Sequence, residues 1–233
     1  MGNEMKRLSV FLMIAVFAGH VHAHFPWLTV SRDGQASYFF GESLADQTYK
    51  MPAGIVKSKI MMREGSKSAG VKMKAVEDDQ FVGKRAIETI PASADLMSQA
   101  TFGVYHGAKL KYYTQYLGGE MPTKFADCQP IKKMDLQAHA VNTDGGVDVY
   151  VLWKGKPLEG AEVSLYCDQG HEEGNSKTDA DGRVSFNDEE VEDGINGIAV
   201  GHTISDEAGK FGDQEYRSAM HYLTATFYDP EDK

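Results

Sequence analysis

Four histidines of this 233-residue chain lie where imidazole nitrogens could bind a metal ion. His106, His202 and His221 each continue a row of alternating apolar residues, and His24 directly precedes the segment FPWLTV. Alternate residues of an extended strand share one face, so each of the three rings extends an apolar face at one end. Imidazole nitrogen suits copper, nickel and zinc ions. The pattern therefore predicts a histidine site for a divalent transition metal.

The three rows also indicate where the rings should lie in a folded chain. The rows are Phe102, Val104, His106; Ile198, Val200, His202; and His221, Leu223, Ala225, Phe227. In a β-sandwich such rows point between the sheets, and their ends lie at the rim of the core. Only a loop separates His202 from His221, so we expect these two rings to be neighbours. If His106 and His24 fold against the same rim, all four histidines converge; the alternative is that each ring caps a sheet edge and bonds to backbone.

The first 23 residues have the three parts of a cleaved secretory signal. A basic start precedes an apolar run over residues 8–19, and Val21 and Ala23 are the small side chains that a signal peptidase selects. The run is shorter than the roughly 20 residues that cross a bilayer as a helix. We therefore expect a periplasmic or secreted protein with no direct membrane insertion after signal cleavage.

The site of cleavage decides what His24 could do. A cut after Ala23 gives His24 a free α-amino group with a pKa of about 8, so the residue could chelate through amine and ring together. A cut after Ala18 leaves a histidine-rich arm without that chelate. An amino-terminal histidine opposite another imidazole resembles the histidine brace of polysaccharide monooxygenases and some copper carriers. That resemblance implies copper at His24, and a copper-dependent polysaccharide oxidase as the minor alternative to a protein that is not an enzyme.

Composition narrows the classes of partner. Acidic residues outnumber basic ones, and the formal net charge is −10. Such a surface repels nucleic acid and anionic lipid and attracts cations, so we expect no nucleic-acid partner. The sequence also has no phosphate-cradling glycine loop, no GxSxG elbow and no HExxH pair, and we assign no catalytic residue.

The chain is expected to be all-β. Alternating apolar residues, 24 glycines and the absence of a long helical stripe favour strands. We predict two packed β-sandwich domains, over 24–130 and 131–233, joined by a linker at 118–133. Short helices over 45–51 or 93–99 are weaker expectations. The predicted strands are FPWLTV, ASYFFG, IVKSKIMM, VKMKAVE, ATFGVYHG, LKYYTQYL, LQAHAV, VDVYVLW, AEVSLYC, RVSFND, NGIAVGH and HYLTATFYD.

Two stretches carry a resemblance to known families. GKPLEGAEVSLYC followed by TDADGRVSF resembles the transthyretin-like or carboxypeptidase-regulatory-like sandwich of bacterial exported proteins. The chain from AHFPWL to HYLTATF is similar to a bacterial exported family of unknown function that is loosely grouped with periplasmic nickel and cobalt uptake accessory proteins. The resemblance implies an Ig-like, transthyretin-like second domain, a nickel, cobalt or copper ion, and a membrane metal transporter as partner. The alternative is a cell-envelope module that binds protein or glycan, with structural histidines.

The roles of the two cysteines and of the two remaining histidines can be interpreted in more than one way. Cys128 and Cys167 are the only cysteines, and in an oxidising compartment they could form a disulfide. Cys167 could equally be a buried free thiol, because it continues an apolar row. His139 lies between alanines and is expected to be structural or exposed. His171 lies in the acidic turn CDQGHEEGN, whose glutamates could help to hold a second cation weakly.

Overall fold

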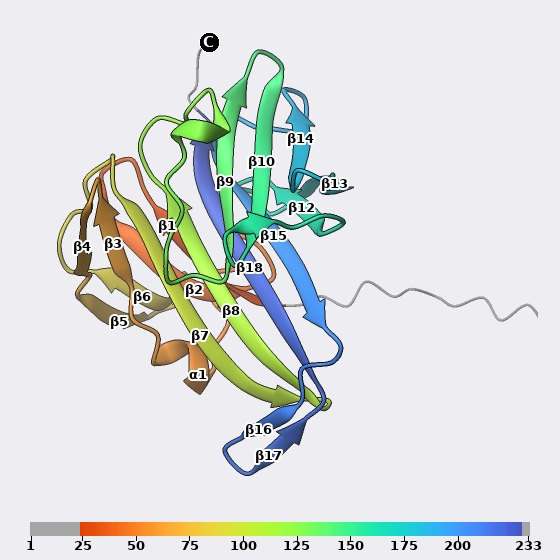
Figure 1. Ribbon diagram of the computed structural model, residues 1–233. Coiled ribbons are helices and arrows are strands. Elements are labelled where there is room, and N and C mark those ends of the chain that lie inside the picture. The colour runs from red at the N-terminus through yellow and green to blue at the C-terminus, as the bar shows by residue number, and fades with distance from the viewer. Residues whose placement is uncertain (1–23, 230–233) are drawn as a thin grey trace, which may run out of the picture.

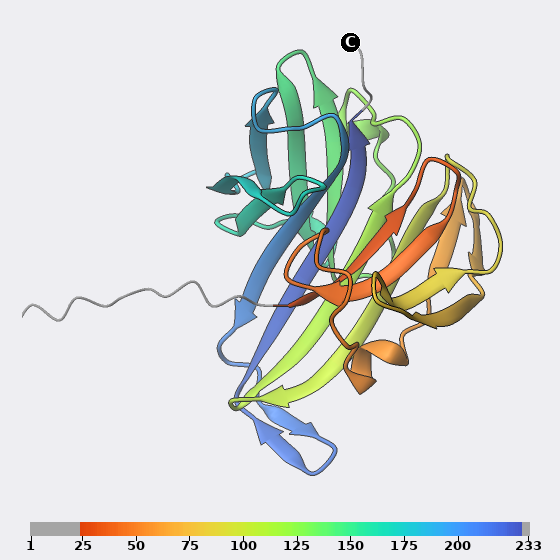
Figure 2. The same ribbon diagram turned by 180° about the vertical axis from the view of Figure 1, so that it is seen from behind.

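The computed structural model describes residues 24–229, and the expected signal segment over 1–23 lies outside them. The described chain is built almost entirely of strands, which confirms the all-β prediction. No helix within these residues is long and apolar enough to cross a membrane. Three layers of sheet make up the molecule, as the two opposite views show (Figures 1 and 2).

An eight-stranded sheet, here called the central sheet, forms the middle layer. Its strand order is β13-β12-β15-β18-β8-β7-β3-β4. The strands are β3 (Met61–Glu64), β4 (Lys67–Gly70), β7 (Asp95–Tyr105), β8 (Ala108–Leu117), β12 (Glu162–Tyr166), β13 (Glu172–Lys177), β15 (Gly194–Ile204) and β18 (Ser218–Asp229).

Two smaller sheets cover the central sheet. The amino-terminal sheet has the order β1-β2-β6-β5, with β1 (Phe25–Val30), β2 (Ala36–Gly41), β5 (Met73–Glu77) and β6 (Val82–Ala86). The carboxy-terminal sheet is formed around β10, with β9 (Leu136–Thr143), β10 (Gly146–Trp153), β11 (Lys156–Pro157) and β14 (Arg183–Asn187). Outside these layers are α1 (Ala53–Val56), the short 3-10 helix η1 (Phe125–Asp127) and a hairpin of β16 (Gly209–Phe211) and β17 (Gln214–Tyr216).

The two covering sheets pack on opposite faces of the central sheet. On β8, Tyr112 belongs to the core beneath the amino-terminal sheet, while the adjacent Tyr113 belongs to the core beneath the carboxy-terminal sheet. Successive side chains of a strand point to opposite faces, so β8 is buried on both sides. The same alternation on β18 places Leu223 under the carboxy-terminal sheet.

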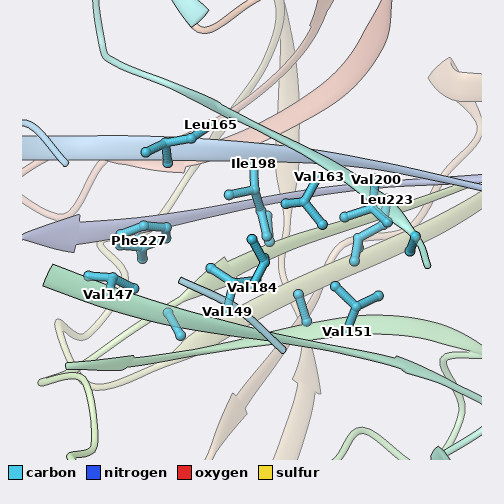
Figure 3. Packing of buried hydrophobic residues seen from close by; sticks show 14 of the residues in the cluster. Val147, Val149, Val151, Val163, Leu165, Val184, Ile198, Val200, Leu223 and Phe227 are labelled. Carbon is cyan, nitrogen blue, oxygen red and sulfur yellow. The ribbon is translucent and has the colours of Figure 1, made fainter. Parts of the chain in front are cut away.

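Figure 3 shows the core beneath the carboxy-terminal sheet. Val147, Val149 and Val151 of β10 face the central sheet, where Ile198 and Leu223 are among their partners. Each of these five side chains is at most 1% exposed. The alternating pattern of the sequence therefore forms the sandwich core that it predicts.

Hydrogen bonds fix the amino-terminal sheet to the central sheet. The Thr224 hydroxyl donates to the carbonyl of Pro26 at 2.5 Å, and the Thr226 hydroxyl donates to the carbonyl of Leu28 at 2.6 Å. Both threonines are at most 1% exposed. These buried hydroxyls thus join β1 to the carboxy-terminal strand β18.

The domain boundary expected near residue 130 separates, along the chain, strands that belong to the same sheet. β8 precedes the boundary and β18 follows it, yet the two pair in parallel from Ala108–Ser218 to Leu117–Phe227. The two apolar cores agree with two sandwich-like halves. The division into two separate domains stays a prediction, because the halves share the central sheet.

Several local predictions are wrong. Residues 45–51 contain no helix, residues 95–99 are part of strand β7, and the one α-helical turn of the described residues, α1, overlaps the start of the segment IVKSKIMM that was expected to form a strand. α1 ends after one turn, where the Ser58 hydroxyl bonds to the carbonyl of Ile55 at 2.7 Å. The polar strands β6 and β13 were not predicted, because their side chains show little apolar alternation. Backbone hydrogen bonds to neighbouring strands hold them in the sheets.

Candidate metal centre

His202 and His221 face each other on neighbouring strands, as the sequence predicts. His202 lies near the end of β15, His221 lies near the start of β18, and the two are directly opposite in the antiparallel register. Their ring centroids are 6.3 Å apart. His221 is only 2% exposed, while His202 is partly buried. Two imidazoles therefore meet at the rim of the carboxy-terminal core.

Trp153 covers this pair from the last residue of β10. Its ring centroid lies 4.7 Å from that of His202 and 4.5 Å from that of His221. Lys154 lies over the indole, with its Nζ 5.0 Å from the ring centroid. The two imidazoles are thus held against an aromatic surface that restricts their movement and shields them from water.

A chain of polar groups orients His221. The Tyr113 hydroxyl lies 3.0 Å from His221 Nδ1, and it also lies 3.5 Å from a carboxylate oxygen of Asp135. If the hydroxyl donates to the carboxylate, it accepts the Nδ1 hydrogen, and Nε2 then carries a lone pair. Nε2 is buried and has no hydrogen-bond partner among the described residues. An imidazole that donates its other ring N–H to an oxygen is the usual arrangement of a metal-binding histidine.

The ring pair could supply two nitrogen ligands to a transition-metal ion. Metal–nitrogen bonds are about 2.0–2.1 Å long, so two rings on one ion have centroids about 5–6.5 Å apart. The observed separation of His202 and His221 lies within that range. The unpartnered Nε2 of His221 would gain a ligand in this way, and His202 would supply the second nitrogen.

Burial keeps both rings neutral. It lowers the pKa of His221 to about 4, with a further decrease from Lys111, whereas Glu207 and Asp135 act in the opposite direction. Burial also lowers the pKa of His202, and the ammonium of Lys154 adds to the effect. A neutral imidazole is the form that binds a metal ion, so neither ring has to lose a proton near neutral pH.

His24 does not join this pair. It lies on the side of the amino-terminal sheet, where its ring contacts Phe40 and Tyr49, with centroid distances of 5.9 Å and 3.9 Å. Its Nε2 is 3.8 Å from a carboxylate oxygen of Glu42 and 3.8 Å from one of Asp46. The central sheet separates this position from the histidine pair, so the expected convergence is wrong for His24.

His106 also lies away from the pair. It has a φ of +48°, and Gly107 has a φ of +80°, so the two form the turn of the β7–β8 hairpin instead of continuing the strand. The ring is exposed and packs edge-on against Tyr105 at 4.1 Å. Ala108 is opposite Ser218 in the parallel register, which puts His106 about 16 Å along the sheet from His221. The prediction that it extends an apolar row is therefore wrong.

A second group of polar side chains lies where the linker crosses the central sheet. Arg63 binds one carboxylate oxygen of Asp95 at 3.0 and 2.6 Å and donates to the carbonyl of Gln129 at 2.7 Å. These groups line a cleft of about 240 Å³ together with Cys128 and His139. His139 is 5% exposed, and its Nε2 has no hydrogen-bond partner among the described residues.

The burial of His139 predicts acid sensitivity. Burial lowers its pKa from 6.5 to about 4, and the guanidinium of Arg63 contributes to the decrease. Between pH 6.5 and about pH 4, His139 is protonated in the unfolded chain and neutral in the folded chain. Its contribution to the free energy of unfolding is therefore fully present above pH 6.5 and is lost as the pH falls to about 4. The slope from one such ring is about 1.4 kcal/mol per pH unit, or about 3 kcal/mol in total. His221 adds a similar decrease.

Denaturant unfolding of the wild type and His139→Gln at several pH values measures this effect. Between pH 6.5 and 4, the free energy of unfolding of the variant should fall less steeply than that of the wild type. If His221 supplies the rest of the effect, the slope of the variant should be about half that of the wild type. Equal slopes for the two proteins would show that His139 does not carry the effect.

Both cysteines are free thiols. Cys167 is fully buried after β12, which agrees with the free-thiol alternative and not with the disulfide. Burial raises the pKa of Cys128 to about 11, with a contribution from Asp127, and burial also raises the pKa of Cys167. Neither thiol is therefore ionised near neutral pH in the absence of a metal.

Sequence reasoning missed three residues of the centre. Trp153 was predicted only as the last residue of the strand VDVYVLW, although that strand ends at the same rim as the histidine rows. Tyr113 and Asp135 come from elements remote in sequence, and no spacing pattern connects them with His221. Comparison with family models, curated proteins and solved structures gives no match.

Proposed function

We propose that this protein binds a divalent transition-metal ion at His202 and His221 and acts in metal handling outside the cytoplasm. The observation that carries the proposal is the buried Nε2 of His221, which has no hydrogen-bond partner among the described residues, on a ring whose centroid lies 6.3 Å from that of His202. An unsatisfied nitrogen in a buried site costs free energy unless a ligand satisfies it. A copper, nickel or cobalt ion would do so.

The surroundings of the pair also support a metal site. Tyr113 and Asp135 orient one ring, and Trp153 packs against both rings. Ligands that are already oriented lose little conformational entropy when they bind an ion. The pair is therefore better prepared for a metal than two freely rotating surface histidines would be.

The role in the cell rests on the sequence. The secretory signal over 1–23 suggests a periplasmic or secreted protein, and the family resemblance suggests an accessory to nickel, cobalt or copper uptake with a membrane transporter as partner. The copper-dependent oxidase gains no support, because among the described residues the ring of His24 contacts aromatic and acidic side chains.

Fluorescence provides a direct test, because the chain has only two tryptophans. Copper(II) bound between His202 and His221 lies beside Trp153 and should quench its emission with a stoichiometry of one ion per chain. Trp153→Phe should remove this quenching, while the matched variant Trp27→Phe should retain it. His24→Ala should also retain it, which separates the pair from any amino-terminal chelate.

The opposite result has a clear meaning. Dialysed protein that binds no stoichiometric copper, nickel or cobalt, and whose melting temperature none of these ions changes, would contradict the proposal. The histidines would then be structural, and the cell-envelope module that binds protein or glycan would be the better interpretation.

A further inference from the structure

A different cluster of metal-binding side chains lies around Cys167. The Sγ of Cys167, a ring nitrogen of His171 and a carboxylate oxygen of Glu173 all lie within 4.8 Å of one another. The same sulfur forms a second such group with carboxylate oxygens of Asp168 and Glu192. One buried thiol is thus surrounded by an imidazole and three carboxylates.

The backbone holds this cluster in a tight turn between β12 and β13. The N–H of Cys167 donates to the carbonyl of His171 at 3.1 Å, and the N–H of Gly170 donates to the carbonyl of Cys167 at 3.0 Å. Gly170 has a φ of +84°, and a side chain there would collide with Ser43. The turn is therefore fixed against the loop after β2.

Glu192 approaches the sulfur from the segment before β15. Asn196, which is fully buried, accepts a hydrogen bond from the N–H of Glu192 at 3.2 Å and donates one to its carbonyl at 2.6 Å. This side-chain clamp fixes the position of Glu192 relative to the turn. The potential ligands thus come from two segments that the central sheet places side by side.

We propose that Cys167, His171 and Glu173, with Glu192 as the further oxygen ligand, form a second site that binds zinc or a zinc-like divalent ion. Sulfur, nitrogen and oxygen donors together are typical of zinc, and sulfur disfavours magnesium and calcium. Three ligand atoms of a tetrahedral zinc site lie about 3.3–3.8 Å apart. The exposed side chain of His171 can rotate to close the present spacing.

This site is separate from the histidine pair. Tyr166 pairs with Gly197, so Cys167 lies level with Asn196. His202 is six residues further along β15, or about 20 Å away. The second site therefore does not depend on the proposed function of the pair.

Cobalt(II) absorption tests the second site on the full chain with both cysteines reduced. Cobalt bound to a thiolate gives a charge-transfer band in the near ultraviolet, and the band should saturate at one ion per chain. Cys167→Ser should abolish the band, and Cys128→Ser is the matched control that should retain it. His171→Ala, at a side chain that is 76% exposed, should fold normally and weaken cobalt binding by about tenfold or more.

The outcomes distinguish the two sites. His221→Ala should lose the quenching of Trp153 by copper. It should keep the cobalt–thiolate band, because the histidine pair contains no sulfur ligand and does not give rise to that band. The absence of the band in the wild type, or its persistence in Cys167→Ser, would overturn the second site and leave the first untouched. An unchanged cobalt affinity in His171→Ala would also overturn it.

Discussion

Replacing His221 with alanine is expected to lower the affinity for copper(II) by about 100-fold or more, since it removes one of the two imidazole ligands. His202→Ala should have a similar effect through the other ligand. Tyr113→Phe keeps both imidazoles and removes the hydroxyl that lies 3.0 Å from Nδ1. The expected loss from this positioning residue is about tenfold to 100-fold. Isothermal titration of dialysed protein at neutral pH measures all three values.

A histidine outside the pair serves as the matched control. His106→Asn removes one imidazole, and asparagine tolerates the left-handed conformation that the turn requires. Its copper affinity should equal that of the wild type. A wild-type affinity in His221→Ala, together with unchanged quenching of Trp153, would show that the ion binds elsewhere.

The second large effect is expected in stability. Trp27 is fully buried on β1, where it packs with Phe39, Leu44 and Phe81 and donates from Nε1 to the carbonyl of Gly41 at 3.2 Å. Trp27→Ala should lower the free energy of unfolding by about 3–5 kcal/mol, because it leaves a large cavity and an unpaired carbonyl. Domains of this size are stable by only about 5–15 kcal/mol, so much of the total is lost.

Denaturant unfolding followed by the emission of Trp153 measures this change. The reporter is the last residue of β10 in the carboxy-terminal sheet, so a lower midpoint there would show that the loss at β1 is transmitted through β8 and β18. Ile87→Ala is the matched control, since this apolar side chain is 61% exposed and its removal should change the free energy by less than about 0.5 kcal/mol. An unchanged Trp153 midpoint in Trp27→Ala would mean that the two halves unfold independently.

Apolar alternation predicted the strands that carry a continuous row of apolar residues. β10 and β18 have their expected faces, because each has one row of apolar residues that must leave water. The same signal fails for β13, with the sequence EEGNSK, since hydrogen bonding to β12 forms that strand without an apolar row. It also fails for His106, where Gly107 allows a turn that ends the row early.

The candidate metal centre was partly predictable, because its two histidines also continue apolar rows. His202 and His221 end rows that meet across one loop, and strand register then brings the two rings together. Trp153, Tyr113 and Asp135 come from three other parts of the chain. Their positions depend on how the carboxy-terminal sheet packs over β8 and β18, and local periodicity contains no information about that packing.

By itself, the sequence determined the strand-rich fold, the two apolar cores and the proximity of His202 to His221, because these follow from which residues avoid water at a period of two. Only the tertiary structure decided that β8 and β18 join both halves in one sheet, that His24 lies on the far side of that sheet, and that Cys167 meets His171 and Glu192. Such long-range contacts arise from strand pairing and layer packing, which depend on the whole chain at once.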